Sequence, residues 1–189
     1  MNTATVERME DALARAASGE HAAFGDIVRE YQAMIFSMAY HFFHDQSLAE
    51  ETAQEVFLRL YQNLGRIKSP AHLMLWLRQV THRRCIDQAR RLPSLPLLAL
   101  DDAPEPAVGP GRSDPLLSER LRRMVASLPE DARTVVILRY QEDLELAEIA
   151  EILEIPINTV KSRLQRSLAV MRAKVTSALE MSAHERPRE

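Results

Sequence analysis

The stretch DLELAEIAEILEIPINTVKSRLQRSLAVM, Asp143 to Met171, decides how the rest of the chain is organised. Two apolar periodicities of helical spacing, Leu146 to Leu153 and Val160 to Met171, are separated by Pro156. A proline cannot continue a helix because it lacks the amide proton and clashes with the preceding turn. We therefore expect the first helix to end at Pro156 and the second to begin near Asn158. Two helices joined by so short a turn form a helix-turn-helix.

The second helix of this pair carries side chains that suit a DNA groove. Amides, a hydroxyl and a guanidinium on its outer face match base edges, whereas flanking cations match phosphates. No acid occurs between Ile155 and Val175, although acids outnumber bases in the whole chain. The plainer alternative is a helical hairpin with a solvated basic face. The candidate base contacts are Asn158, Ser162, Gln165 and Arg166, and the flanking candidates are Thr159, Lys161 and Arg163, the last two for phosphates.

The charges are segregated along the chain. Its 189 residues have a formal net charge of −3. Arg59 to Leu92 nevertheless holds eight Arg and Lys against one acid, and Ile155 to Val175 holds five against none. The remaining residues then carry about −15. Binding to DNA would have to depend on these two basic patches and not on the field of the whole protein.

The composition excludes several other classes of protein. A single cysteine excludes an internal disulfide and a multi-cysteine zinc site, and the pair His41 and His44 lacks further ligands, so no metal or cofactor is expected. There is no Gly-rich phosphate loop or nucleophile motif, so an enzyme is not expected. No signal sequence and no apolar run of the ~18–20 residues that span a membrane is present, which predicts a cytoplasmic protein with no membrane segment of its own.

Helical periodicities fill the chain on both sides of a proline-rich segment. Residues 1–92 form one predicted helical domain and residues 116–178 a second, which contains the helix-turn-helix. Residues 93–115 hold six prolines and two glycines with no usable period, which is typical of a linker, and residues 179–189 read as a polar tail. The predicted fold class is all-α, with two small helical domains joined by a Pro-rich linker.

One helix of the first domain has a clear predicted start. Asp45 or Ser47 would cap it, with Glu50 and Glu51 in its first turn, and it would run to about Leu64. The basic loop GRIKS, residues 65–69, follows, and Pro70 suits the first turn of the next helix.

Three segments resemble motifs of the extracytoplasmic-function sigma factors. Ala49 to Tyr61 reads AEETAQEVFLRLY and is similar to the family motif AEDxxQEVFLRxW. Trp76 to Arg91 reads WLRQVTHRRCIDQARR and resembles the family helix WLyrIARNxxiDxxRR. The third segment, LPEDARTVVILRY followed by EIAEILEIPINTVKSRLQRSL, is similar to the family's C-terminal helix-turn-helix domain. Together they cover nearly the whole chain outside the linker and the tail.

The resemblance implies a promoter-specificity subunit of bacterial RNA polymerase. RNA polymerase core and promoter DNA are then the partners, and many relatives are also held by an anti-sigma factor. The C-terminal domain would read the minus-thirty-five element, and the first motif would dock on core through Glu51, Gln54 and Glu55. The minus-ten element would be melted and read by the basic part of the N-terminal domain, for which the candidates are Arg66, Lys68, His72, Arg78, His82 and Arg83. The alternative is a stand-alone helix-turn-helix regulator, which would usually carry a sensing domain of strands and helices before the motif.

The chain departs from the family pattern at three positions. Arg83 stands where the family usually has Asn, and Glu154 stands where the turn usually has Gly. A left-handed residue at Glu154 would store ~1 kcal/mol of strain. Glu145 replaces the usual capping Ser, so capping is expected to be weak or to fall to Asp143.

Overall fold

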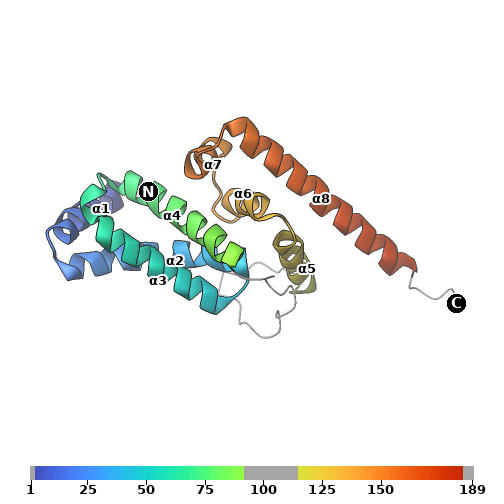
Figure 1. Ribbon diagram of the computed structural model, residues 1–189, viewed down its shortest axis with the longest axis horizontal. Helices are drawn as coiled ribbons and strands as arrows, with labels where there is room; N and C mark the ends of the chain where they lie inside the picture. Colours follow the sequence, from blue (N-terminus) through green and yellow to red (C-terminus); the bar gives the residue numbers. More distant parts are fainter. Residues whose placement is uncertain (1–2, 92–114, 185–189) are drawn as a thin grey trace. The chain divides into compact units, whose positions relative to one another are not determined.

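The computed structural model describes residues 3–91 and 115–184, with side chains for residues 4–91 and 121–176 (Figure 1). Within these ranges the regular structure is helical and contains no strand. The chain divides into two compact units, Met1–Leu95 and Pro96–Glu189. The predicted all-α fold with two helical domains is therefore confirmed. The linker predicted over residues 93–115 lies, apart from its last residue, outside the described part of the chain.

The N-terminal unit consists of four long helices and one short turn. They are α1 (Thr3–Ala17), α2 (His21–Phe43), α3 (Gln46–Asn63), the 3₁₀ turn η1 (Leu64–Arg66) and α4 (Pro70–Arg91). The helix α2 packs against α1, α3 and α4 (Figure 1). Each helix contributes apolar side chains at helical spacing to one core, and full burial of one such side chain stabilises the fold by roughly 1.5–3 kcal/mol. The core includes Met9, Leu13, Ile27, Tyr31, Ile35, Val56, Leu60, Leu73 and Leu77.

The start of α3 corrects one expectation. The Asp45 carboxylate accepts a hydrogen bond from the Leu48 backbone N–H at 2.8 Å, so Asp45 is the N-cap, one of the two predicted candidates. Because the cap lies at Asp45 and not at Ser47, the helix begins at Gln46 and no acid falls in its first turn. The prediction that Glu50 and Glu51 lie in the first turn was wrong. Pro70 does occupy the first turn of α4.

The C-terminal unit consists of α5 (Pro115–Ala126), α6 (Glu130–Tyr140), α7 (Leu146–Leu153) and α8 (Ile157–His184). The helix α8 contacts the other three and extends well beyond α6 and α7, into the segment expected to be a polar tail (Figure 1). The helix α6 supplies four consecutive buried side chains, Val135–Leu138, which makes it the hub of this core. Ile149 and Ile152 of α7 and Val160 of α8 pack as its buried neighbours.

The turn of the helix-turn-helix has at Glu154 the left-handed residue that the family pattern suggested. The helix α7 ends at Leu153, before the proline, because Glu154 adopts a left-handed conformation with φ 54° and ψ 40°. The Ile155 N–H then donates to the Ala150 carbonyl at 3.1 Å, as in a Schellman motif. Pro156 instead precedes α8, and its carbonyl accepts from the Thr159 N–H at 2.8 Å. The predicted end of the first helix was therefore too late, and α8 begins one residue earlier than expected.

The start of α7 is capped by Glu145 and not by Asp143. Glu145 has the extended backbone of an N-cap, and its N–H donates to the Glu148 carboxylate at 2.8 Å. This contact is the reciprocal half of a capping box. Asp143 lies in the preceding turn with φ 50°. The expectation that capping falls to Asp143 was wrong, because Glu148 can satisfy the Glu145 N–H from the third helical position.

Candidate nucleic-acid interface

The outward side of α8 presents a basic and polar surface. Asn158, Lys161, Gln165 and Arg166 are exposed, and Ser162 between them is half-buried. These five residues, which we call the recognition face, recur at spacings of three and four along the helix and so share one side of it. The buried Val160 and Ser167 lie on the opposite side. Thr159 is half-buried at the edge of this face.

Hydrogen bonds within α8 restrict what two of these side chains can offer. The Ser162 hydroxyl donates to the Asn158 carbonyl at 2.6 Å, so its proton is used inside the helix and its oxygen remains an acceptor. The Arg166 Nε donates to the Ser162 carbonyl at 3.2 Å, which leaves the two Nη groups at the outer end of the guanidinium.

Arg163 does not belong to the recognition face. Its Nη2 lies 2.9 Å from an Asp131 carboxylate oxygen at the start of α6, and its side chain is only 27% exposed. The guanidinium therefore fastens α8 to α6. The sequence could not show this ion pair, because the two residues are brought together only when the helices pack.

The helix α7, which precedes α8, carries the opposite charge. Glu145, Glu148, Glu151 and Glu154 are all exposed on α7 and at its two ends. Acids on this helix oppose close approach to phosphates. The positive charge of the helix-turn-helix is thus confined to α8.

In the N-terminal unit, the GRIKS loop is held by the first turn of α4. The Ser69 hydroxyl accepts from the His72 N–H at 3.1 Å, which caps the helix. The Lys68 N–H donates to the His72 Nδ1 at 3.2 Å, so the ring of His72 supports the loop backbone. The side chains of Arg66 and Lys68 are exposed. Two cations are thus presented on a loop of defined shape.

The candidate residues on α4 lie on two different sides of the helix. Arg83 follows His72 by eleven residues, about three turns, and so lies on the same side as His72 and the loop. Arg78 and His82, four residues apart, are half-buried on another side. Arg78 lies close enough to Tyr31 of α2 to affect its pKa. Burial and the Glu30 charge raise the pKa of the Tyr31 phenol, and the Arg78 charge lowers it. The fold therefore places His72 and Arg83 on one side of α4 and Arg78 and His82 on another, with His72, Arg78 and His82 all half-buried.

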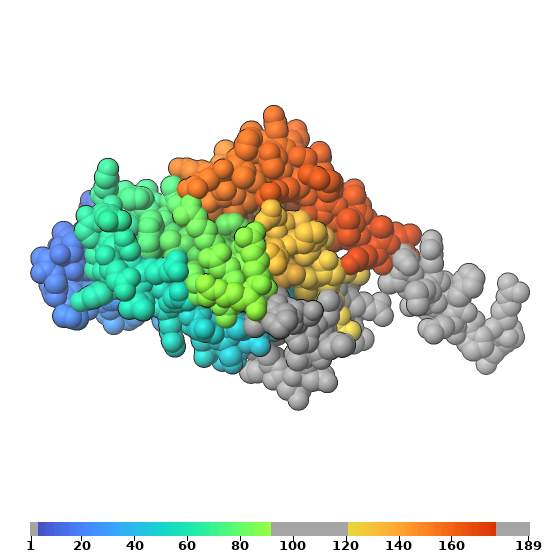
Figure 2. All heavy atoms as spheres, viewed as in Figure 1, coloured from blue at the N-terminus to red at the C-terminus, as the bar shows by residue number. Residues whose placement is uncertain are grey.

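The helix α3 has an exposed face that joins polar and apolar groups. Glu51 and Gln54 are exposed there, as their positions in the first motif suggested. Leu58, 58% exposed, follows Glu51 by seven residues, and Tyr61, 45% exposed, lies one turn further. We call these four residues the α3 outer face. The helices α3 and α4, teal to green, both reach the surface of the N-terminal unit in Figure 2. Leu58 and Tyr61 were not predicted, although the helical period alone would place them beside Glu51 and Gln54.

Glu55, the third docking candidate, is directed into the unit and not outward. Its carboxylate accepts from the guanidinium of Arg84 on α4, whose side chain is only 7% exposed. The other carboxylate oxygen lies 3.4 Å from Arg59 Nη2 on the next turn of α3. Both oxygens of Glu55 therefore have partners within the N-terminal unit.

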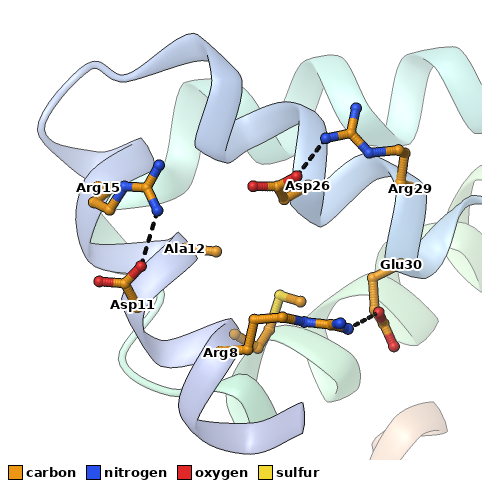
Figure 3. A pocket seen from close by; sticks show the side chains of 8 residues that line it. Arg8, Asp11, Ala12, Arg15, Asp26, Arg29 and Glu30 are labelled. Atoms are coloured by element: carbon orange, nitrogen blue, oxygen red, sulfur yellow. Dashed lines mark hydrogen bonds and ion pairs between the residues drawn. The ribbon is translucent and has the colours of Figure 1, made fainter.

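A groove of about 270 Å³ between α1 and α2 has its charges paired (Figure 3). Arg8 pairs with Glu30, Arg15 with Asp11 and Arg29 with Asp26. Three arginines and three carboxylates thus neutralise one another around the opening. The groove therefore has no charge that would favour an anion or a cation as ligand.

The comparisons with known proteins cover both units. Residues 27–93 match the model of sigma-70 region 2, and residues 118–171 match that of sigma-70 region 4. The chain is similar to the ECF RNA polymerase sigma factor SigW of Bacillus subtilis (strain 168), with 31% identity over 171 residues that span 82% of this chain and 89% of the relative.

Two solved structures share the fold. CnrH, in complex with the cytosolic domain of CnrY, matches with a TM-score of 0.65 and 19% identity over 90% of this chain and 98% of CnrH. The sigma factor RpoE of Bartonella quintana, in complex with the anti-sigma factor NepR, matches with a TM-score of 0.62 and 17% identity over 81% of this chain and 96% of RpoE.

The described residues hold neither a membrane-spanning helix nor a cluster of metal ligands. In residues 3–91 and 115–184, no helix has the length and apolar character needed to cross a membrane. Over the same part of the chain, no cluster of three or more His, Cys, Asp and Glu side chains is arranged to hold a metal ion.

Proposed function

The chain belongs to the extracytoplasmic-function family of RNA polymerase sigma factors, and from this premise we propose how its two units divide the work of the subunit. As a sigma subunit, the protein binds RNA polymerase core and directs sequence-specific transcription initiation. The main observation behind this proposal is the recognition face of α8, which is exposed while the opposite side of the helix packs into the C-terminal unit.

The C-terminal unit reads the minus-thirty-five element through the recognition face. Arg166 suits a bidentate contact to a guanine, and Asn158 and Gln165 suit adenines. Ser162 can only accept, since its proton is bonded to the Asn158 carbonyl, so it suits a base amino group. Lys161 is placed for a phosphate and Thr159 for the edge of the contact. Arg163 supports this surface from behind by holding Asp131.

The N-terminal unit captures the minus-ten element in its single-stranded form. A base can be read in a protein pocket only after it has left the stack. The exposed cations Arg66 and Lys68, with His72 and Arg83 on the adjoining side of α4, form the surface for that strand. Arg78 and His82 are half-buried on another side of α4, and we assign them to supporting that helix and not to direct contact with DNA.

The α3 outer face docks on RNA polymerase core. Leu58 and Tyr61 supply exposed apolar area, and Glu51 and Gln54 supply a polar border, which is the usual composition of a protein interface. Leu58 and Tyr61, three residues apart on one side of α3, are the exposed apolar side chains that a protein partner would cover.

Membership of this family also leads us to propose three general properties of the protein. The protein acts as an initiation factor without a catalytic reaction of its own. It works in the cytoplasm, where bacterial RNA polymerase transcribes. An anti-sigma factor is a candidate second partner, because the related structure of RpoE holds that sigma factor together with the anti-sigma factor NepR.

Run-off transcription tests this function. Purified core polymerase is mixed with a pool of genomic promoter fragments, with and without the protein. Transcripts that start at defined positions only when the protein is present support the proposal. A protein that binds DNA but yields no new transcripts with core would be a stand-alone regulator.

A further inference from the structure

We propose that Arg84 is a positioning residue for core polymerase binding, and that Glu55 acts through Arg84 and does not touch the polymerase. This inference rests on the proposed docking of the α3 outer face. It assigns a role to a residue outside the positions that the family motif specifies, since Arg84 falls on an unspecified position of the α4 motif.

The geometry places the two charges where helices α3 and α4 meet. Arg84 lies on α4 and Glu55 on α3, twenty-nine residues apart in sequence. Arg84 is 7% exposed and Glu55 31% exposed, so their pairing is largely shielded from water. The neighbouring Arg59 reaches the second Glu55 oxygen at 3.4 Å and is itself 43% exposed. The carboxylate is thus enclosed between an inner and an outer guanidinium.

A buried guanidinium depends on its counter-charge. Removal of water from a charge is unfavourable by several kcal/mol unless a partner compensates, and loss of one partner of a buried pair is strongly destabilising. The Arg84 Nε has no hydrogen-bond partner among the described side chains and backbone, so compensation falls mainly on the contact with Glu55. Without Glu55, Arg84 would gain hydration only if α3 and α4 separated or rotated.

Such a movement would reach the docking surface directly. Gln54 precedes Glu55 on α3, and Glu51 and Leu58 lie one helical turn to either side of it. The helix is rigid over this length, so a rotation that moves Glu55 moves the whole α3 outer face with it. An interface is sensitive to such shifts because its packing is as dense as a protein interior.

A double-mutant cycle distinguishes positioning from direct contact. The variants are Glu55→Gln, Arg84→Met and the two combined, each in the full chain, and the measurement is the Kd for core polymerase. We expect Glu55→Gln to weaken binding about tenfold in the native background, which corresponds to about 1.4 kcal/mol. In the Arg84→Met background the same change should have little effect. An equal loss in both backgrounds would mean that Glu55 contacts the polymerase itself, and would overturn the proposal.

An effect of the variants on the stability of the N-terminal unit has to be distinguished from an effect on the position of the α3 outer face. Each Kd is measured at a temperature at which circular dichroism shows the variant to be folded. Ile27→Val, in the core of the same unit, should lower the melting temperature without changing the Kd. Arg8→Met removes the exposed pair with Glu30 that joins α1 and α2, and it should also leave the Kd unchanged. If Ile27→Val weakens core binding as much as Glu55→Gln does, the effect of the pair is only one of stability and the proposal fails. Should Arg84→Met not fold, Arg84→Gln serves in its place, because it also removes the charge that Glu55 faces but keeps a polar side chain.

One more variant separates this proposal from the function on which it rests. Leu58→Asp places a charge on the α3 outer face without touching the Arg84–Glu55 pair. If Leu58→Asp leaves the Kd unchanged, core does not dock on α3, and both the docking assignment and the role of Arg84 are wrong. If Leu58→Asp abolishes binding while Glu55→Gln acts equally in both backgrounds, only the role of Arg84 is wrong.

Discussion

Asp131 at the start of α6 holds Arg163 of α8 by a 2.9 Å ion pair, which keeps this cation out of the recognition face. Lys161, on the same helix, is exposed. A cation that contacts a phosphate releases a counterion, and its loss lowers the salt slope of binding by about one. We expect Lys161→Ala to flatten the slope by that amount and Arg163→Gln to leave it nearly unchanged.

The measurement is the affinity of the protein for a minus-thirty-five fragment over a series of salt concentrations. Arg163→Gln should instead lower the melting temperature of the C-terminal unit, because it breaks the tie between α8 and α6. A slope that falls by one in Arg163→Gln and stays constant in Lys161→Ala would reverse the two assignments.

The left-handed Glu154 predicts a stabilising substitution. Its φ of 54° is a conformation that glycine adopts without the steric cost of a side chain. Glu154→Gly should therefore stabilise the C-terminal unit by ~1 kcal/mol, which corresponds to a rise of several degrees in melting temperature. Ala147→Gly, on the exposed side of α7, is the matched control and should lower the midpoint by a similar amount. A midpoint that falls in both variants would mean that contacts of the Glu154 side chain outweigh the relief of strain.

The GRIKS loop should contribute most to transcription at the step in which the promoter is melted. Arg66→Ala and Lys68→Ala remove the two exposed cations while leaving the bonds among Lys68, Ser69 and His72, which involve other atoms. Transcription from a duplex promoter should fall more than transcription from a template already melted at the minus-ten element, because only the duplex requires strand capture. Arg29→Ala, in the paired groove, serves as the control for loss of a surface arginine. An equal fall on both templates would indicate simple backbone binding.

Glu55→Lys should damage the fold of the N-terminal unit. The sequence motif alone suggests a surface charge whose reversal would be tolerated. In the structure the new cation would face the buried Arg84, with Arg59 beside it. Breaking a buried pair is unfavourable by about 3 kcal/mol or more. Thermal unfolding should show a clear drop in the melting temperature, whereas an unchanged midpoint would mean that Glu55 turns outward in solution.

Periodicity alone predicted much of this fold. The apolar spacing located each helix of the helix-turn-helix, and the Asp45 cap followed from residue type. The end of α7 was misplaced because Pro156 is the strongest helix breaker in the stretch, whereas the actual stop is the left-handed Glu154, which the family pattern suggested but residue propensity does not favour.

The site was predicted less completely than the fold. The place of Leu58 on the α3 outer face could have been predicted from its helical spacing to Glu51. The pairs between Glu55 and Arg84 and between Asp131 and Arg163 could not, since each joins two helices whose packing fixes the partner. A sequence shows which side chains are charged, but not which charges the fold neutralises.

The dependence of promoter binding on RNA polymerase core tests the account most directly. Two small basic patches stand against a net charge of −3, and α7 carries acids beside the recognition helix. Repulsion therefore opposes DNA binding by the free protein. Core would hold both units at promoter spacing and join two weak contacts through a high effective concentration.

The measurement is the Kd for a duplex promoter and for a scrambled duplex, with and without saturating core polymerase. We predict weak binding with little discrimination for the free protein, and tight, sequence-specific binding once core is present. Tight and specific promoter binding by the free protein, unchanged by core, would contradict the account.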